Sequence, residues 1–243
     1  MPRKPREIRT GGIYHVIQRG VEKRKIFLKN QDYSRFILGL ELFNDVASMD
    51  IWQRFFQLKQ GGTDPPWKKL EAVRKERAKK ASRLVDLLAF VLMSNHIHLV
   101  MREIRKGGIS LFMRKMGGYS TYFNKQHDRV GPLFQSRFKS VEVENDRQLR
   151  AIFAYVHTNP VELWEPGWKE RKVRNVQEAL RKLEEYRWSS YGDYVGKPTF
   201  SQTTQRTLFS DLFGGTQGCR EAVKEWVKYK AARTPRDFGI ALE

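Results

Sequence analysis

Two histidines stand one residue apart in an apolar stretch, at His96 and His98. Apolar residues precede them at 87–93 and follow them at 99–101, and Ser94-Asn95 lies between, which predicts two buried strands joined by a tight turn. Side chains at positions i and i+2 of a strand lie on the same face, so the two imidazoles are expected side by side. Such a pair can bind a divalent metal, although most histidines in strands are structural.

A tyrosine and an asparagine share one ridge of a helix that the sequence predicts before Pro160. The apolar stripe of this helix has the i, i+3, i+4, i+7 spacing and consists of Leu149, Ile152, Phe153 and Val156. On a helical wheel Tyr155 falls at the edge of the stripe, and Asn159 lies one turn further on the same flank. Taken alone, the pattern also suits a boundary tyrosine whose hydroxyl contacts water and an asparagine that ends the helix.

A tyrosine near a two-histidine metal site has a particular chemical use. A phenol, with an ordinary pKa near ~10, is a poor nucleophile at neutral pH. A divalent ion that polarises a phosphate and stabilises charge on the leaving oxygen lowers that barrier. Attack by Tyr155 on a DNA phosphate would leave a phosphotyrosine on one DNA end and a free 3′-hydroxyl on the other. The energy kept in that bond would allow transfer to a new 3′-hydroxyl without ATP.

The composition predicts a polyanionic partner. Lys and Arg number 46 against 27 Asp and Glu, a formal net charge of +19. Such an excess favours nucleic acid, with an anionic membrane surface as the alternative. The chain has no long uncharged apolar segment, so no membrane span is expected. The single cysteine, Cys219, excludes an intrachain disulfide and a cysteine-cluster zinc site, and it suits a cytoplasmic protein.

The predicted elements follow the order strand, helix, strand, strand, helix, strand, helix. Because the hairpin at Ser94-Asn95 leaves no room for a crossover, we expect an antiparallel sheet with helices on one face, an α+β fold of the ferredoxin-like kind. The other expected elements are strands at 13–18 and 138–144, and helices at 32–46, 110–126 and 146–159. A basic helix is expected at about 67–85, and helices near 175–186 and 218–232 are expected in the C-terminal part.

In order and spacing, several segments resemble the single-tyrosine HUH transposases, and most closely the REP-associated tyrosine transposases. The segments that carry the likeness are Tyr14 to Gly20 with Ile26-Phe27, Met93 to His98, Phe123 to Lys125, Gly131 to Ser140, Tyr155 to Pro160 and Trp188 to Tyr191. They span about residues 11–48 and 86–195. The chain departs from the family pattern at about 49–85, where a basic insertion replaces a short link. Its density of Lys and Arg suggests contacts with the DNA backbone.

The resemblance implies an enzyme, a metal-dependent endonuclease and strand transferase for single-stranded DNA beside hairpin-forming repeats. It implies a catalytic domain of RNA-recognition-like fold at 1–163, followed by an extension at 164–243 that packs on it or continues it. His96 and His98 would bind Mg²⁺ or Mn²⁺, Asn159 would supply a third, amide ligand, and Tyr155 would be the nucleophile. Both a monomer and a homodimer are compatible with the family. The alternative is a catalytically silent protein on the same fold that binds hairpin DNA or RNA.

Basic residues in five parts of the chain are the predicted DNA contacts. They are Arg3, Lys4 and Arg6 of the N-terminal arm; Arg19 after the first strand; Lys79 and Lys80 of the basic helix; Arg114 and Lys115; and Arg137 and Lys139.

Three further features have simpler interpretations. His15 could face the metal, but a structural role is favoured. His157 falls on the flank away from Tyr155, so we expect it to pack or to bond the backbone near Pro160. The segment 188–191 contains two serines, but no histidine partner or oxyanion-hole motif supports a serine nucleophile.

Overall fold

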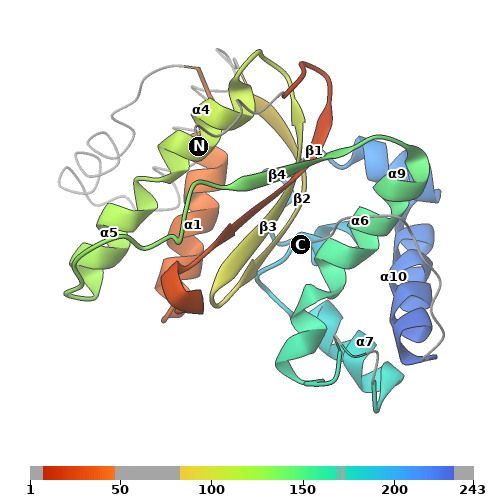
Figure 1. Cartoon of the computed structure of the whole chain (residues 1–243). Helices are drawn as coiled ribbons and strands as arrows, with labels where there is room; N and C mark the ends of the chain where they lie inside the picture. The colour runs from red at the N-terminus through yellow and green to blue at the C-terminus, as the bar shows by residue number, and fades with distance from the viewer. Residues whose placement is uncertain (1–7, 47–82, 169, 171–172, 233–243) are drawn as a thin grey trace, which may run out of the picture.

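The computed structural model describes residues 8–46, 83–168, 170 and 173–232, and within them the chain builds a four-stranded antiparallel sheet (Figure 1). The strands lie in the order β2-β3-β1-β4. Their bounds are β1 Ile13–Arg19, β2 Val85–Met93, β3 His96–Glu103 and β4 Lys139–Val143. The α+β class and the antiparallel hairpin at Ser94-Asn95 are confirmed.

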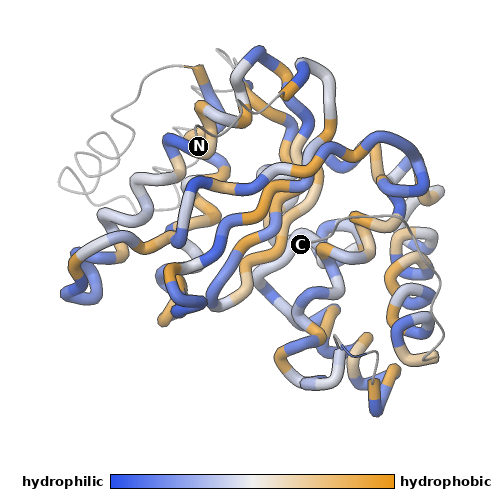
Figure 2. The backbone as a smooth tube through the Cα atoms, viewed as in Figure 1, coloured by the Kyte–Doolittle hydropathy of each residue, from blue (hydrophilic) through white to orange (hydrophobic). Residues whose placement is uncertain are grey.

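One face of the sheet is covered by α1 (Asn30–Leu42), α4 (Gly108–Met116) and α5 (Tyr119–Gln126), as Figure 1 shows. The core beneath these helices is apolar: Phe36 of α1, Phe112 of α4 and Leu99 of β3 are fully buried there. Hydrophobic residues follow the strands in Figure 2, and hydrophilic stretches mark the peripheral loops. We refer to this side of the sheet as the helix face.

The opposite face packs against α6 (Asp146–Thr158), behind which the C-terminal helices lie (Figure 1). The 3₁₀ helix η2 follows α6 directly, and the remaining bounds are η2 Asn159–Leu163, α7 Val176–Glu185, α8 Tyr191–Tyr194, α9 Thr207–Phe213 and α10 Thr216–Ala231. Val91 and Val100 of the sheet share this second core with Phe153 of α6 and Val223 of α10. We refer to this side as the α6 face.

The expectation of helices on one face therefore holds for α1, α4 and α5, but not for α6. The physical reason is visible in β2, where eight of nine residues are buried. A strand that is apolar on both sides needs cover on both sides. Residues before and after the predicted boundary at 163/164 share the second core, and the boundary itself stays a prediction.

The C-terminal part also covers the outer edge of β2. The backbone N–H of Leu92 donates to the Trp188 carbonyl at 2.9 Å, and the Ser190 N–H donates to the Phe90 carbonyl at 3.0 Å. An isolated bridge joins Val91 to Ser189 between these two bonds. Since an open strand edge is a template for unwanted pairing, this segment completes the sheet.

Several element boundaries differ from the predicted ones. The single helix expected at 110–126 is two helices, α4 and α5, because the glycine pair Gly117-Gly118 interrupts it. Pro160 does not end the helical path, since a proline is tolerated in the first turn of η2. The short helices α8 and α9 were not expected from the sequence.

The expected basic helix lies outside the described residues except at its end, where Val85 already belongs to β2. The same holds for most of the predicted insertion at 49–85. Within the described part of the chain, no helix is both long enough and apolar enough to cross a bilayer.

Candidate active site

The strand register brings both histidines of β3 to the α6 face. The ring centroids of His96 and His98 are 4.9 Å apart, with the ring planes 83° from parallel. Both residues are buried, with 6% and 2% of their surface exposed. The two imidazoles therefore lie close together on one rigid strand, as two ligands of the same metal ion must.

A third histidine, His15 of β1, completes the group. Its Nε2 lies 2.8 Å from Nδ1 of His98, and the two rings are stacked at 5.0 Å. Burial lowers the pKa of His15 to about 3, so the ring is neutral at physiological pH. The sequence favours a structural role for His15 and does not predict its direct contact with His98.

Tyr155 of α6 lies against these rings. Its ring centroid is 5.5 Å from that of His98 and 5.8 Å from that of His15, both in edge-to-face arrangements. The helix that carries it begins at a side-chain cap, since Asn145 accepts a hydrogen bond from the Gln148 N–H. Apolar packing of α6 in the second core then sets the height and rotation of Tyr155 over the sheet.

Asn159 begins η2 directly after α6 and is 8% exposed. Its side-chain Nδ2 donates to the Tyr155 carbonyl at 3.0 Å. The nitrogen of the amide is thereby fixed, and its oxygen points elsewhere. The structure thus couples the side chain of Asn159 to the backbone of Tyr155 across one helical turn.

The metal-binding capacity of this group depends on the two histidines and on a neutral ligand. In the part of the chain that the structure describes, no three His, Cys, Asp or Glu side chains are arranged to hold an ion. Nδ1 of His96 is engaged by Asn95 Oδ1 at 2.6 Å and Nδ1 of His98 by His15, so Nε2 is the nitrogen each ring would offer. Two imidazoles and the amide oxygen of Asn159 are the ligands that this group would offer to a divalent ion.

Of the predicted DNA contacts, Arg19 and Lys139 lie on the α6 face beside the histidines. Arg19 is directly opposite His96 in the β1–β3 register, and Lys139 is opposite Ile17, which is itself opposite His98. Arg137 is exposed in the loop before β4. That loop is attached to the end of β1, because the Gln135 N–H donates to the Arg19 carbonyl at 2.9 Å.

The other predicted contacts are not brought to this group. Arg114 and Lys115 belong to α4 on the helix face, and Lys115 Nζ donates to the Asp45 carbonyl. Arg3, Lys4, Arg6, Lys79 and Lys80 lie outside the described residues. Their role in DNA binding stays a prediction.

His157 and the segment 188–191 have structural roles. His157 is fully buried, burial lowers its pKa to about 3, and its Nε2 lies 2.8 Å from Ser190 Oγ. The expected packing of His157 is confirmed, but its partner is this hydroxyl and not the backbone near Pro160. The expectation that segment 188–191 has no histidine partner is therefore wrong, although both residues are fully buried. Ser190 Oγ also accepts from the Phe90 N–H at 2.9 Å, which ties the segment to β2.

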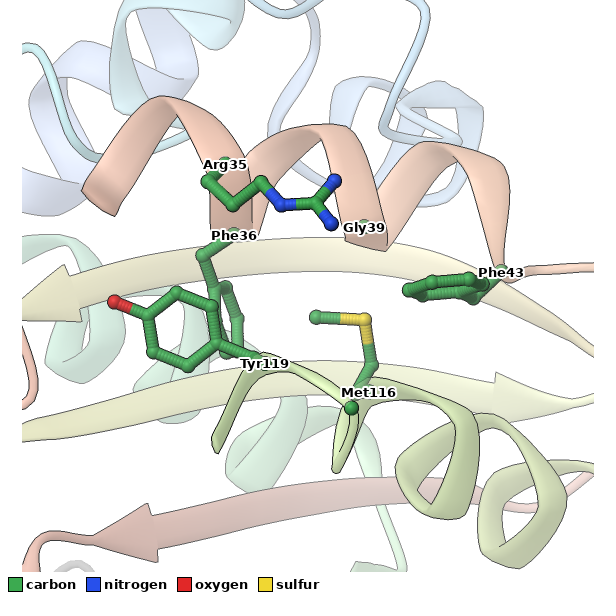
Figure 3. Close-up of a pocket in the computed structure, with 7 residues that line it drawn as sticks. Arg35, Phe36, Gly39, Phe43, Met116 and Tyr119 are labelled. Atoms are coloured by element: carbon green, nitrogen blue, oxygen red, sulfur yellow. The ribbon is translucent and has the colours of Figure 1, made fainter. Parts of the chain in front are cut away.

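A small pocket opens on the helix face, between α1 and the α4–α5 pair (Figure 3). Figure 3 shows Phe36, Phe43 and Met116 around it, with the guanidinium of Arg35 near the rim. Its lining is mostly apolar and contains no histidine or carboxylate. The pocket therefore has no side chains that would hold a metal ion, and the candidate active site is the histidine group on the α6 face.

Residues 64–159 match the family model of IS200-like transposases. The match includes His96, His98, Tyr155 and Asn159, and it confirms the resemblance that the motifs indicate. This match covers less than half of the chain and ends at Asn159, the first residue of η2. No curated protein matches the chain.

Among solved structures, the chain is similar to a REP-associated tyrosine transposase bound to a REP hairpin. The two sequences are 16% identical, the TM-score is 0.47, and the alignment covers 82% of this chain and 90% of that one.

Proposed function

We propose that this protein is a metal-dependent DNA endonuclease and strand transferase of the transposase type, with Tyr155 as its nucleophile. The observation that carries the proposal is the contact of the Tyr155 ring with His98, whose neighbour His96 shares the same face. The transposase family match over these residues supports the same reaction class.

In this proposal His96, His98 and the Asn159 amide hold a Mg²⁺ or Mn²⁺ ion. When bound, the ion polarises the scissile phosphate and stabilises charge on the leaving oxygen. The chain contributes the positions: β3 fixes the two rings, and α6 presents the phenol above them. Neutral His15 adds no repelling positive charge beside the ion.

The bond changes are those of a transesterification. The Tyr155 phenol loses its proton, its oxygen bonds to phosphorus, and the bond from phosphorus to the 3′-oxygen breaks. The departing oxygen takes up a proton and becomes a free 3′-hydroxyl. Because a phosphodiester is exchanged for a phosphotyrosine ester, another 3′-hydroxyl can later attack the phosphotyrosine and release the enzyme.

Single-stranded DNA next to a hairpin is the proposed substrate, on the strength of the motif resemblance. Arg19 and Lys139 on the α6 face, with Arg137 beside them, offer phosphate contacts within reach of the histidines. The net charge of +19 supplies the general attraction for a polyanion.

The test is adduct formation with hairpin oligonucleotides. Wild-type protein, Tyr155→Phe and the matched control Tyr122→Phe, on the helix face, are each incubated with Mn²⁺ and labelled single-stranded hairpins, then separated on a denaturing gel. We expect a covalent protein–DNA band from wild type and Tyr122→Phe and none from Tyr155→Phe, with hairpin binding retained. An adduct from Tyr155→Phe would reject the nucleophile. Hairpin binding by the wild type with no adduct would favour a silent binding protein.

A further inference from the structure

The two histidines of β3 can bind an ion only through a nitrogen that carries no proton. A neutral imidazole has one proton, on Nδ1 or on Nε2, and the hydrogen bond made by one nitrogen decides the state of the other. Partners outside the ligands commonly fix this choice in metal sites. The hydrogen bonds around His96 and His98 therefore carry information about the site.

We propose that Asn95 is a positioning residue that fixes the tautomer of His96, so that Nε2 is its metal-binding nitrogen, and that His15 does the same for His98 only in one of two arrangements. The inference deepens the proposed function, on which its metal-binding part rests.

For His96 the assignment follows from a chain of two hydrogen bonds. Asn95 Nδ2 donates to the Lys23 carbonyl at 3.2 Å, and a carbonyl can only accept. The amide oxygen of Asn95 is therefore the atom 2.6 Å from Nδ1 of His96. Since that oxygen can only accept, Nδ1 carries the proton and Nε2 carries the lone pair.

The Lys23 carbonyl is held in place by an unusual loop. Glu22 and Lys23 both adopt left-handed backbone conformations, with φ of 51° and 60°, which non-glycine residues rarely adopt without a compensating role. The loop is fastened to the hairpin turn by the Gly20 N–H, which donates to the Asn95 carbonyl at 2.8 Å. A side chain at Gly20 would meet the Arg24 carbonyl at 2.2 Å, so only glycine fits there.

For His98 the partner is another imidazole, which can donate or accept. If His98 is to bind an ion through Nε2, its Nδ1 donates to Nε2 of His15, and the proton of His15 then lies on Nδ1. Nδ1 of His15 is buried without a hydrogen-bond partner among the described residues. In the opposite arrangement His15 donates, His98 is protonated on Nε2, and that nitrogen cannot bind.

The two ligands are thus prepared differently. The tautomer of His96 is fixed before an ion binds, because the amide oxygen of Asn95 can only accept a hydrogen bond. His98 is set when the ion arrives, because binding at its Nε2 selects one of two arrangements of the His15–His98 pair. Without the ion, the arrangement with the His15 proton on Nδ1 is disfavoured, because that buried donor has no partner among the described residues.

The tautomers can be read in metal-free protein by NMR of ¹⁵N-labelled histidine, at one pH above the ordinary pKa of histidine and without DNA. We expect His96 of the wild type to carry its proton on Nδ1. In Asn95→Ala it should move to Nε2, and in Asn95→Asp, where a carboxylate still accepts, it should stay on Nδ1. Asn124→Ala, which removes a side-chain amide of α5 on the helix face, is the matched control and should change neither tautomer.

Mn²⁺ affinity, measured by electron paramagnetic resonance, is the second readout. We expect Asn95→Ala and His15→Phe each to weaken binding by about 10–100-fold, with Asn95→Asp and His15→Gln closer to wild type because each retains an acceptor. A wild-type His96 protonated on Nε2, or an Asn95→Ala variant with unchanged tautomer and affinity, would overturn the proposal. Neither result depends on Tyr155, so the adduct experiment and this one can fail separately.

Discussion

The two faces of the sheet give their histidines different partners. On the helix face, Nε2 of His127 lies 3.1 Å from the carboxylate of the buried Asp32. On the α6 face, imidazoles pair with another imidazole or with a hydroxyl, as His15 does with His98 and His157 with Ser190. Histidine is the commonest metal ligand in proteins, so the face that gathers His15, His96 and His98 is the better place to look for chemistry.

The neighbours His98 and Leu99 allow the sharpest test of this contrast, since they lie on opposite faces of one strand. We expect His98→Ala to reduce the rate of DNA cleavage by on the order of 10³-fold, about 4 kcal/mol of transition-state stabilisation. The rate is measured in single-turnover assays with a hairpin oligonucleotide and Mn²⁺. Cleavage at the wild-type rate would remove the α6 face from the mechanism.

Leu99→Ala should do the reverse. Leu99 is fully buried in the core of the helix face, and truncation of such a residue costs about 2–5 kcal/mol of unfolding free energy. Urea denaturation measures the loss, and cleavage per folded molecule should stay near that of wild type. A comparable loss of stability in His98→Ala would show that the two faces share one structural role.

Acid should weaken the α6 face first, because His15 and His157 both belong to it. Burial lowers the pKa of each to about 3, below the ordinary value of 6.5. The unfolded chain then binds more protons between these values, so stability is complete above pH 6.5 and falls as the pH drops toward 3. Each group contributes up to ~1.4 kcal/mol per pH unit. Denaturation at several pH values should give a shallower acid slope for His157→Gln than for wild type.

The smallest expected effect concerns salt. Arg19→Gln and Lys139→Gln, on the α6 face, should each reduce the slope of log K against log salt by about 1, as one phosphate contact is lost. Arg114→Gln, on the helix face, is the comparison. Titrations of a hairpin oligonucleotide at several salt concentrations measure the slopes, and a loss with Arg114→Gln alone would place the DNA on the other side of the sheet.

The local parts of this arrangement could be predicted from the sequence. The two-residue period of a strand puts His96 and His98 on one face, and helical periodicity puts Tyr155 and Asn159 on one ridge. These relations depend on positions a few residues apart. The two glycines at 117–118 similarly explain, after the fact, why one long helix becomes two.

The parts that could not be predicted depend on contacts between distant segments. The contact of His15 with His98 requires the register of two strands 83 residues apart. The stripe of α6 predicts that the helix packs, but not on which side of the sheet. The pairing of 188–190 with β2 is made by backbone groups, which leave no mark in the side-chain pattern.

The pairing of residues 188–190 with β2 has a consequence for the order of events during synthesis. A nascent chain that has emerged as far as residue 163 already contains His96, His98, Tyr155 and Asn159. It does not yet contain the segment that covers the edge of β2 or the helices that pack behind α6. Domains fold as units, and exposed edges and apolar faces of partly made ones aggregate. The residues proposed to react are therefore translated before the segments that hold α6 against the sheet. The position of Tyr155 consequently depends on residues made after it.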